Sequence, residues 1–150
     1  MSDHHVVCSD CGGVNRIPAA KPALAAKCGK CGALLFEGKP KDVSAEVFER
    51  QISRSTVPVI VDIWAPWCGP CRAMAPAYEA AAERLEPDAR LIKLNSDDQQ
   101  QISGRLGIRS IPTMILFHGG REIARQSGAM PASQIVDWAR QAVSNAEHGN

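Results

Sequence analysis

The sequence lacks any long apolar segment. Its longest apolar run, from Val57 to Ala65, is broken by Pro58 and Asp62, and it falls well short of the roughly 18–20 residues that a membrane-spanning helix requires. The first residues carry neither the basic region nor the apolar region of an export signal. These absences exclude a helical membrane span and a membrane partner, and they predict a protein that stays in the cytoplasm.

The sequence also has little net charge. It holds 17 Lys and Arg against 16 Asp and Glu, so its formal charge is +1, which gives no general reason to expect nucleic acid or an anionic membrane as a partner. Hydrophobic residues make up 45% and charged residues 22% of the chain, an ordinary globular composition. Its 150 residues suffice for one compact domain with a small appendage, but not for two full domains.

Cysteine is the informative residue type. Six cysteines form three Cys-x-x-Cys pairs: Cys8/Cys11, Cys28/Cys31 and Cys68/Cys71. In the cytoplasm structural disulfides are reduced by the thiol systems of the cell. The paired cysteines are therefore predicted to be metal ligands or redox centres.

Composition changes near residues 36–43, which divides the chain into residues 1–36 and residues 37–150. The first part holds four cysteines with only scattered aliphatic residues, too few to hold a fold by burial alone. The segment from Phe36 to Val43 is polar and turn-prone, which is typical of a linker or an edge strand. The second part carries the alternating apolar patterns of a larger domain.

Helical and strand patterns alternate along residues 37–150. Ser44 can cap a helix through about Ser53, and Gly107, which favours a helix end, closes another. The pattern predicts an α/β fold whose single sheet contains parallel and antiparallel strands. The expected strands are 57–65, 89–95, 113–117 and 121–127, the last two joined by a glycine hairpin, and the expected helices are 44–53, 69–85 (interrupted by Pro76), 97–106 and 131–143.

Cys68 and Cys71 lie where a buried strand is followed by a helix. At a helix N-terminus, unpaired backbone N–H groups and the helix dipole stabilise a thiolate, and Pro70 suits the first turn because it needs no N–H partner there. Cys71 follows three residues later and can form a disulfide with Cys68. The pattern predicts that Cys68 attacks a substrate disulfide and that Cys71 resolves the mixed disulfide; the alternative is a structural metal knuckle or two inert thiols.

Asp62 is a carboxylate within the apolar strand. Burial would raise its pKa toward neutrality, which suits a group that accepts and donates protons. Its alternative is a structural carboxyl group with no chemistry.

The segment around Cys68 and Cys71 resembles the active-site signature of the thioredoxin family: Val61-Asp62-Ile63-Trp64-Ala65 is followed by Trp67-Cys68-Gly69-Pro70-Cys71-Arg72. The resemblance extends from about residue 40 to about residue 147. It implies the thioredoxin fold, a central mixed sheet flanked by helices. It also implies a monomeric protein-disulfide reductase that acts on disulfide-containing clients and is recharged by an NADPH-linked thioredoxin reductase. Gly69-Pro70 resembles the reducing members of the family.

The resemblance assigns further residues. It places Asp62 beneath Cys71, where it assists deprotonation, and it brings Lys93 toward Asp62. It makes the Ile111–Pro112 bond cis, beside the disulfide. The residues implied to receive the substrate are Trp67, Gly69, Pro70, Ile111, Pro112 and Gly128, although core packing is the alternative for tryptophan.

Cys8, Cys11, Cys28 and Cys31 form two pairs with sixteen residues between them, a spacing typical of zinc sites. A glycine follows each pair, Gly12 and Gly32, and glycine adopts the positive φ that a metal knuckle often needs. The pattern predicts one structural zinc ion, closed by four thiolates, in a ribbon that the metal helps to fold; no organic cofactor is expected. Two disulfides, a redox-switchable zinc site and an iron–sulfur cluster are the alternatives. The combination with a Trp-Cys-Gly-Pro-Cys domain resembles thioredoxins of the bacterial thioredoxin 2 type.

Two other functions compete with a reductase. The ribbon could be a binding module for a dedicated client or nucleic acid, but its basic residues lack the interleaved aromatic residues typical of nucleic-acid binding. The ribbon could also be an oxidative-stress sensor that releases zinc when its thiols are oxidised.

Overall fold

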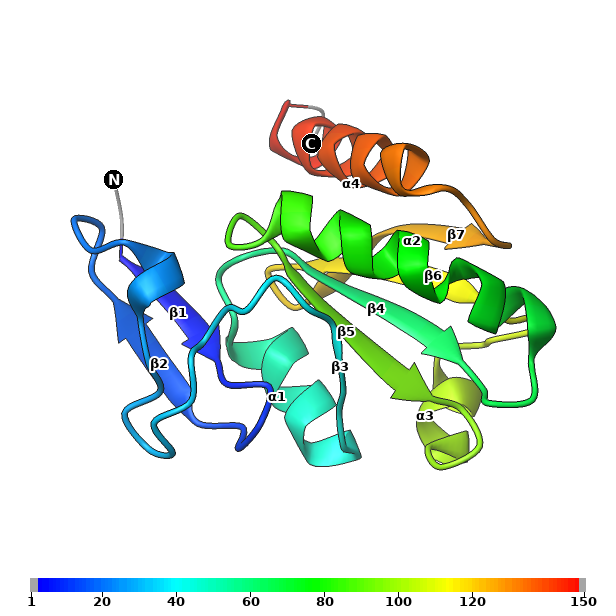
Figure 1. Cartoon of the computed structure of the whole chain (residues 1–150), viewed down its shortest axis with the longest axis horizontal. Helices are drawn as coiled ribbons and strands as arrows, with labels where there is room; N and C mark the ends of the chain where they lie inside the picture. Colours follow the sequence, from blue (N-terminus) through cyan, green and yellow to red (C-terminus); the bar gives the residue numbers. More distant parts are fainter. Residues whose placement is uncertain (1–2, 149–150) are drawn as a thin grey trace.

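The computed structural model describes residues 3–148, which form two separate β-sheets (Figure 1). Strands β1 (His4–Val7) and β2 (Val14–Ile17) pair antiparallel in a small N-terminal hairpin, which is followed by the short helix η1 (Ala23–Ala25). The second sheet has five strands in the order β3-β5-β4-β6-β7. Their bounds are Lys41–Asp42 for β3, Val59–Trp64 for β4, Arg90–Asn95 for β5, Thr113–His118 for β6 and Arg121–Ser127 for β7.

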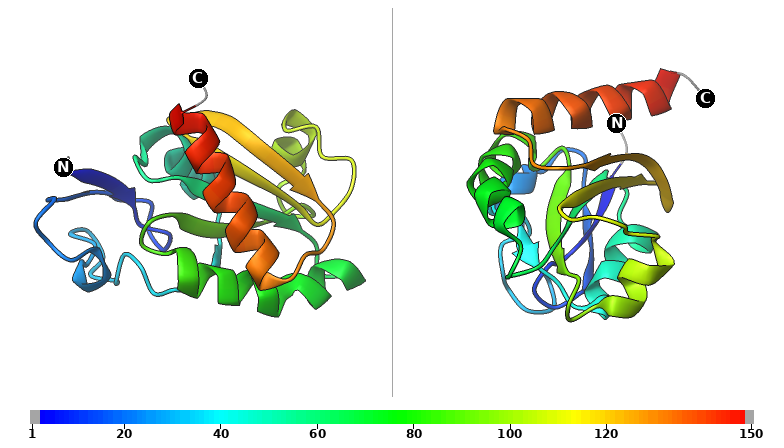
Figure 2. Two further views of the ribbon diagram at one scale, coloured as in Figure 1. Left: turned by 90° about the horizontal axis from the view of Figure 1, so that it is seen from above. Right: turned by 90° about the vertical axis from the view of Figure 1, so that its right-hand side faces the viewer.

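The larger sheet is mixed, as the sequence predicts. Strands β3 and β4 run parallel to β5, whereas β6 runs antiparallel to β4 and to β7. Helices α1 (Ala45–Arg54) and α3 (Gln100–Arg105) cover one face, and α2 (Gly69–Leu85) and α4 (Ala132–His148) cover the other (Figure 2). Each face buries its own apolar cluster. Successive residues of β4 point to opposite faces, so Ile60 belongs to the cluster under α2 and α4, and Val61 to the cluster under α1 and α3. This is the thioredoxin fold that the sequence predicts, with helices on both faces of the sheet.

Local signals act where they were expected. The hydroxyl of Ser44 accepts a hydrogen bond from the backbone N–H of Val47 at 3.2 Å and so caps α1. Gly107, which follows the C-cap residue of α3, has φ 69°, and the β6–β7 turn has positive φ at Gly119 and Gly120. Positive φ at both turn positions is what a tight hairpin requires.

Several element ends differ from the prediction. Strand β4 begins at Val59, two residues late, and α3 begins at Gln100 instead of Asp97; the Asp97 carboxylate bonds to the indole of Trp67 and does not cap the helix. Helix α2 continues through Pro76 to Leu85. Helix α4 extends to His148, five residues beyond the predicted end, because its last turns are exposed and need no apolar stripe.

The hairpin lies beyond the amino ends of β4 and β5, at the left of Figure 1, whereas the loop from β4 to α2 lies at their carboxyl ends, at the right. The N–H of His5 donates to the hydroxyl of Thr56 at 2.9 Å, and the N–H of Thr56 donates to the His5 carbonyl at 2.9 Å. Val57 joins the small apolar cluster of the N-terminal segment. Residues 3–148 include no helix that combines the length and the apolar character of a membrane span.

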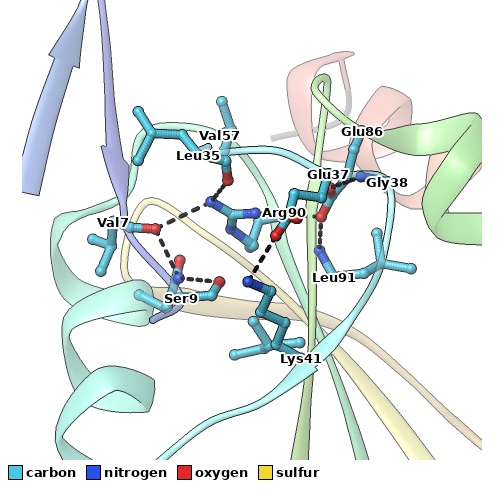
Figure 3. Close-up of polar contacts among 12 residues, drawn as sticks. Val7, Ser9, Leu35, Glu37, Gly38, Lys41, Val57, Glu86, Arg90 and Leu91 are labelled. Carbon is cyan, nitrogen blue, oxygen red and sulfur yellow. Dashed lines mark hydrogen bonds and ion pairs between the residues drawn. The ribbon is translucent and has the colours of Figure 1, made fainter. Parts of the chain in front are cut away.

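Arg90 of β5 lies at the junction between the N-terminal segment and the larger sheet (Figure 3). Its buried guanidinium donates to the carbonyls of Val7 at 3.2 Å and Leu35 at 2.5 Å, and it lies 4.3 Å from the ring centroid of Phe36. Glu86, also buried, supplies the counter-charge at 3.4 Å. A charge in a low-dielectric interior must be paired and hydrogen-bonded, so this set of contacts holds the N-terminal segment in one place against the sheet.

Candidate active site and metal centre

Cys68 and Cys71 form a disulfide at the start of α2, with their Cα atoms 5.2 Å apart. Cys68 is the N-cap residue, and its sulfur accepts a hydrogen bond from the Cys71 N–H at 3.2 Å. Pro70 occupies the first turn, where no N–H is needed. The helix N-terminus thus directs a backbone donor at the sulfur that must carry negative charge during exchange.

A groove of about 520 Å³ runs beside this disulfide. Four of the predicted substrate-binding residues line it, namely Trp67, Gly69, Pro70 and Ile111, together with Cys68. Trp67 is 67% exposed, the largest exposed fraction among the large apolar side chains of residues 3–148. Cys71 does not line the groove, so a partner in the groove would meet Cys68 first.

The loop before β6 completes this side of the groove. The Ile111–Pro112 bond is cis, and the Ile111 carbonyl lies 3.8 Å from the sulfur of Cys68. Pro112 and Gly128 do not line the groove, but they contact each other, because the Gly128 N–H donates to the Pro112 carbonyl at 2.9 Å. Gly128 has φ 95°, a conformation that favours glycine.

Asp62 is 1% exposed, and neither carboxylate oxygen has a hydrogen-bond partner. It shares the α2 face of β4 with Ile60, because residues two apart point the same way. Burial raises the pKa of Asp62 to about 7, a shift opposed by the charge of Lys93 and increased by that of Asp42. Lys93 is the register partner of Asp62 on β5, yet its Nζ lies over the Trp64 ring, 4.2 Å from the centroid.

The four N-terminal cysteines converge on one point. Their sulfurs all lie within 4.8 Å of one another, and the distances across the two pairs are 3.7 Å for Cys8–Cys31 and 3.6 Å for Cys11–Cys28. A tetrahedral metal with bonds of about 2.3 Å to sulfur needs sulfurs about 3.8 Å apart. The four thiols therefore fit a tetrahedral metal centre.

Each pair sits on the same backbone turn. Cys8 and Cys28 each accept at their carbonyl from the glycine four residues on, Gly12 and Gly32, at 2.9 Å. These glycines have φ 78° and 82°, as the sequence predicts. Backbone N–H groups also donate to the sulfurs of Cys11 and Cys28 at 3.4 Å, which stabilises thiolate charge.

Sequence reasoning missed part of the active-site groove. Asp97, from the loop after β5, does not line the groove but accepts a hydrogen bond from the indole of Trp67, which does, at 3.1 Å. The lining residues that the sequence did not indicate are Ser96, Ser103, Gly104, Ile108, Arg109 and Ser110. Proximity to Pro112 could have suggested residues 108–110; nothing in the sequence singles out the others.

Comparison with known families agrees with this geometry. The thioredoxin family matches residues 39–141. A second family, described as thioredoxin 2, N-terminal, is a zinc ribbon and matches residues 7–33.

Individual relatives are similar over most of their length. Thioredoxin C-3 of Corynebacterium nephridii is 36% identical over 133 residues, 89% of this chain and 91% of that protein. Thioredoxin 1 of a Nostoc species is 41% identical over 93 residues, 62% of this chain and 87% of that protein. Among solved structures, the Malassezia sympodialis thioredoxin Mala s 13 superposes with a TM-score of 0.65 at 29% identity, covering 73% of this chain and 95% of that one.

Proposed function

The chain belongs to the thioredoxin family and is a protein dithiol–disulfide oxidoreductase, and we propose that it reduces client disulfides through Cys68 and is recharged by an NADPH-linked thioredoxin reductase. One observation carries the proposal: a disulfide-forming pair caps the N-terminus of α2, and only its first cysteine lines the groove.

The exchange takes two steps. The Cys68 thiolate attacks one sulfur of a client disulfide, forming a mixed disulfide and releasing the other client sulfur as a thiolate, which takes up a proton. The Cys71 thiol then loses its proton, and its thiolate attacks Cys68. The Cys68–Cys71 bond forms, the second client sulfur leaves with the electron pair, and the client is reduced by two electrons while the protein is oxidised by two.

We assign the proton of Cys71 to Asp62, and we assign Lys93 the task of limiting how far burial raises the pKa of that carboxyl. Support comes from the burial of Asp62, its unpartnered oxygens and its position on the α2 face. We also propose that Trp67, Gly69, Pro70 and Ile111 receive an extended client segment, with Pro112 and Gly128 shaping the backbone beside it.

The test is reduction of insulin disulfides with dithiothreitol as the electron source. The wild-type protein should turn over, and Cys68→Ser should fall to the uncatalysed rate because no attacking sulfur remains. Cys71→Ser should instead accumulate a mixed disulfide on Cys68, and mass spectrometry of trapped complexes would identify clients. Equal turnover of Cys68→Ser and wild type would rule the proposal out.

For the N-terminal segment, residues 1–36, we propose one structural zinc ion held by Cys8, Cys11, Cys28 and Cys31, beside a redox domain of residues 37–150. Four thiolates leave no open coordination position, so the metal would supply folding energy and no chemistry. A reducing compartment such as the cytoplasm would keep these thiols free to bind it. Metal analysis of purified protein, expected to give one zinc per chain, tests this assignment.

A second function has one observation in its favour: Cys31 is exposed, so peroxide can reach one ligand. A redox sensor would release metal as its ribbon thiols oxidise. Peroxide titration with a zinc indicator distinguishes this role, because a purely structural site should retain its metal at doses that alter reductase activity.

A further inference from the structure

Three charged residues lie side by side on the α2 face of the sheet. Lys93 on β5 is in register with Asp42 on β3 and with Asp62 on β4. Residues in register on neighbouring strands point to the same face, and Leu91 and Ile60, two residues before Lys93 and Asp62, both belong to the core beneath α2. The Lys93 cation therefore lies between the exposed carboxylate of Asp42 at the sheet edge and the buried carboxylate of Asp62.

Trp64 lies across this row. Its indole N–H donates to the Asp42 carboxylate at 2.6 Å, and Lys93 Nζ lies 4.2 Å from its ring centroid. The same side chain packs against the cluster that contains Cys68 and Cys71. Trp64 thus contacts both Asp42 and the cluster that holds the redox pair.

Lys93 is not bound to Asp62. Among the described residues both Asp62 oxygens are without partners, and Lys93 Nζ lies over the Trp64 ring instead. The other groups facing Asp62 cannot replace that cation. Tyr78 of α2 is neutral and donates to the carbonyls of Ile60 and Ile92, and the antiparallel neighbour on β6 is Met114.

We propose that Asp42 is a positioning residue for proton transfer at Asp62: its carboxylate anchors Trp64 across Lys93 and holds part of the Lys93 charge away from Asp62. The proposal rests on the assigned role of Asp62 in the proposed function. Asp42 touches no reacting atom and acts only through Trp64 and Lys93.

Two variants separate the two parts of this role. Asp42→Asn removes the charge but keeps an oxygen that can accept the indole N–H, and Asp42→Ala removes both. Glu79→Gln is the matched control, because it removes one exposed carboxylate from the outer side of α2. The readouts are NMR titration of the Asp62 carboxyl carbon, the Trp64 indole resonance and the pH profile of the resolving step.

In Asp42→Asn the Asp62 carboxyl should titrate at lower pH, by about half a unit or about threefold in proton occupancy, because its anion loses a repelling neighbour. The resolving-step profile should move in the same direction, while the indole resonance stays near its wild-type position. In Asp42→Ala the shift should be at least as large, and the indole resonance should move.

Coincident titration curves for wild type, Asp42→Asn, Asp42→Ala and Glu79→Gln would overturn the inference. The NMR titration does not depend on turnover, so it remains decisive if a variant is inactive. Failure of the wild type to reduce insulin would defeat the proposed function instead, which distinguishes the two outcomes.

Discussion

The N-terminal ribbon and the larger domain use the same Cys-x-x-Cys spacing for different chemistry, and the backbone around each pair decides which. In the ribbon each pair ends on a glycine with positive φ, so the chain turns back and the sulfurs of two pairs face one centre. At Cys68 the chain enters a helix instead, and the two sulfurs of one pair bond to each other. The sequence spacing alone does not separate a metal ligand from a redox centre.

The two regions also differ in what stabilises them. The larger domain buries an apolar cluster on each face of its sheet. The ribbon has one small cluster, to which the larger domain contributes Val57 and in which Cys8 and Cys28 are members. Ligand sulfurs are thus part of the little core that the ribbon has, and this contrast can be tested by variants that affect only one region.

The largest effect is expected from loss of the metal site. Cys28→Ser or chelation should unfold the ribbon, because structural zinc supplies about 10–16 kcal/mol in comparable small sites. In NMR spectra the resonances of β1 and β2 should lose their chemical-shift dispersion, while those of β4 and α2 keep theirs. Cys68→Ser is the converse control, with the ribbon intact and insulin reduction lost. Simultaneous melting of both regions in Cys28→Ser would show instead that the larger domain depends on the folded ribbon.

Next in size is the junction. Arg90→Met should lower the free energy of unfolding by about 3–5 kcal/mol, because it leaves Glu86 buried without a counter-charge. Urea unfolding measures the loss. The double variant Arg90→Met/Glu86→Gln should recover much of it, since replacing a whole buried pair is far less costly than breaking it. No recovery in the double variant would show that the carbonyls of Val7 and Leu35 matter more than the charge pair.

A third prediction concerns the active site of the larger domain. The Asp62 pKa is raised from 3.8 to about 7, so the folded state binds the proton more tightly than the unfolded state does. The free energy of unfolding therefore falls as pH rises between these values and is constant above them. At about 1.4 kcal/mol per unit, the fall reaches at most about 4 kcal/mol, and Asp62→Asn should abolish this component.

Comparison of urea unfolding at pH 5 and pH 8 checks this prediction, with Glu79→Gln as the control that should keep the wild-type pH dependence. If Asp62→Asn kept the wild-type difference in the free energy of unfolding between pH 5 and pH 8, groups other than Asp62 would cause that difference.

The smallest effect is expected at the surface of the junction. Lys41 pairs with Asp10 of the ribbon at 2.7 Å and with Glu37 at 2.8 Å, but it is about a third exposed. Lys41→Met should cost less than about 1 kcal/mol, and salt should reduce the difference further. A loss as large as that of Arg90→Met would show that the ribbon is held by its exposed charges.

Local signals made much of this arrangement predictable. The Ser44 cap, the two ribbon glycines and the position of Cys68 before a helix act over a few residues and can be found in the sequence. Arg90 cannot, because in sequence it is one charged residue in an apolar strand, and its partners Val7 and Leu35 are far away in the chain. Asp42 could not be found for the same reason, because its position beside Lys93 depends on strands β3 and β5, which meet only in the folded sheet.

The outer strand β7 has a consequence for behaviour in concentrated solution. It lies at the edge of the sheet, and its exposed residues include Arg121 and Glu122, with a further ion pair between Arg125 and Glu122 at 2.8 Å. Fixed charges of both signs along an edge discourage pairing with the edge of another sheet. The charged edge therefore disfavours the stacking of protein molecules into fibres through the backbone of β7.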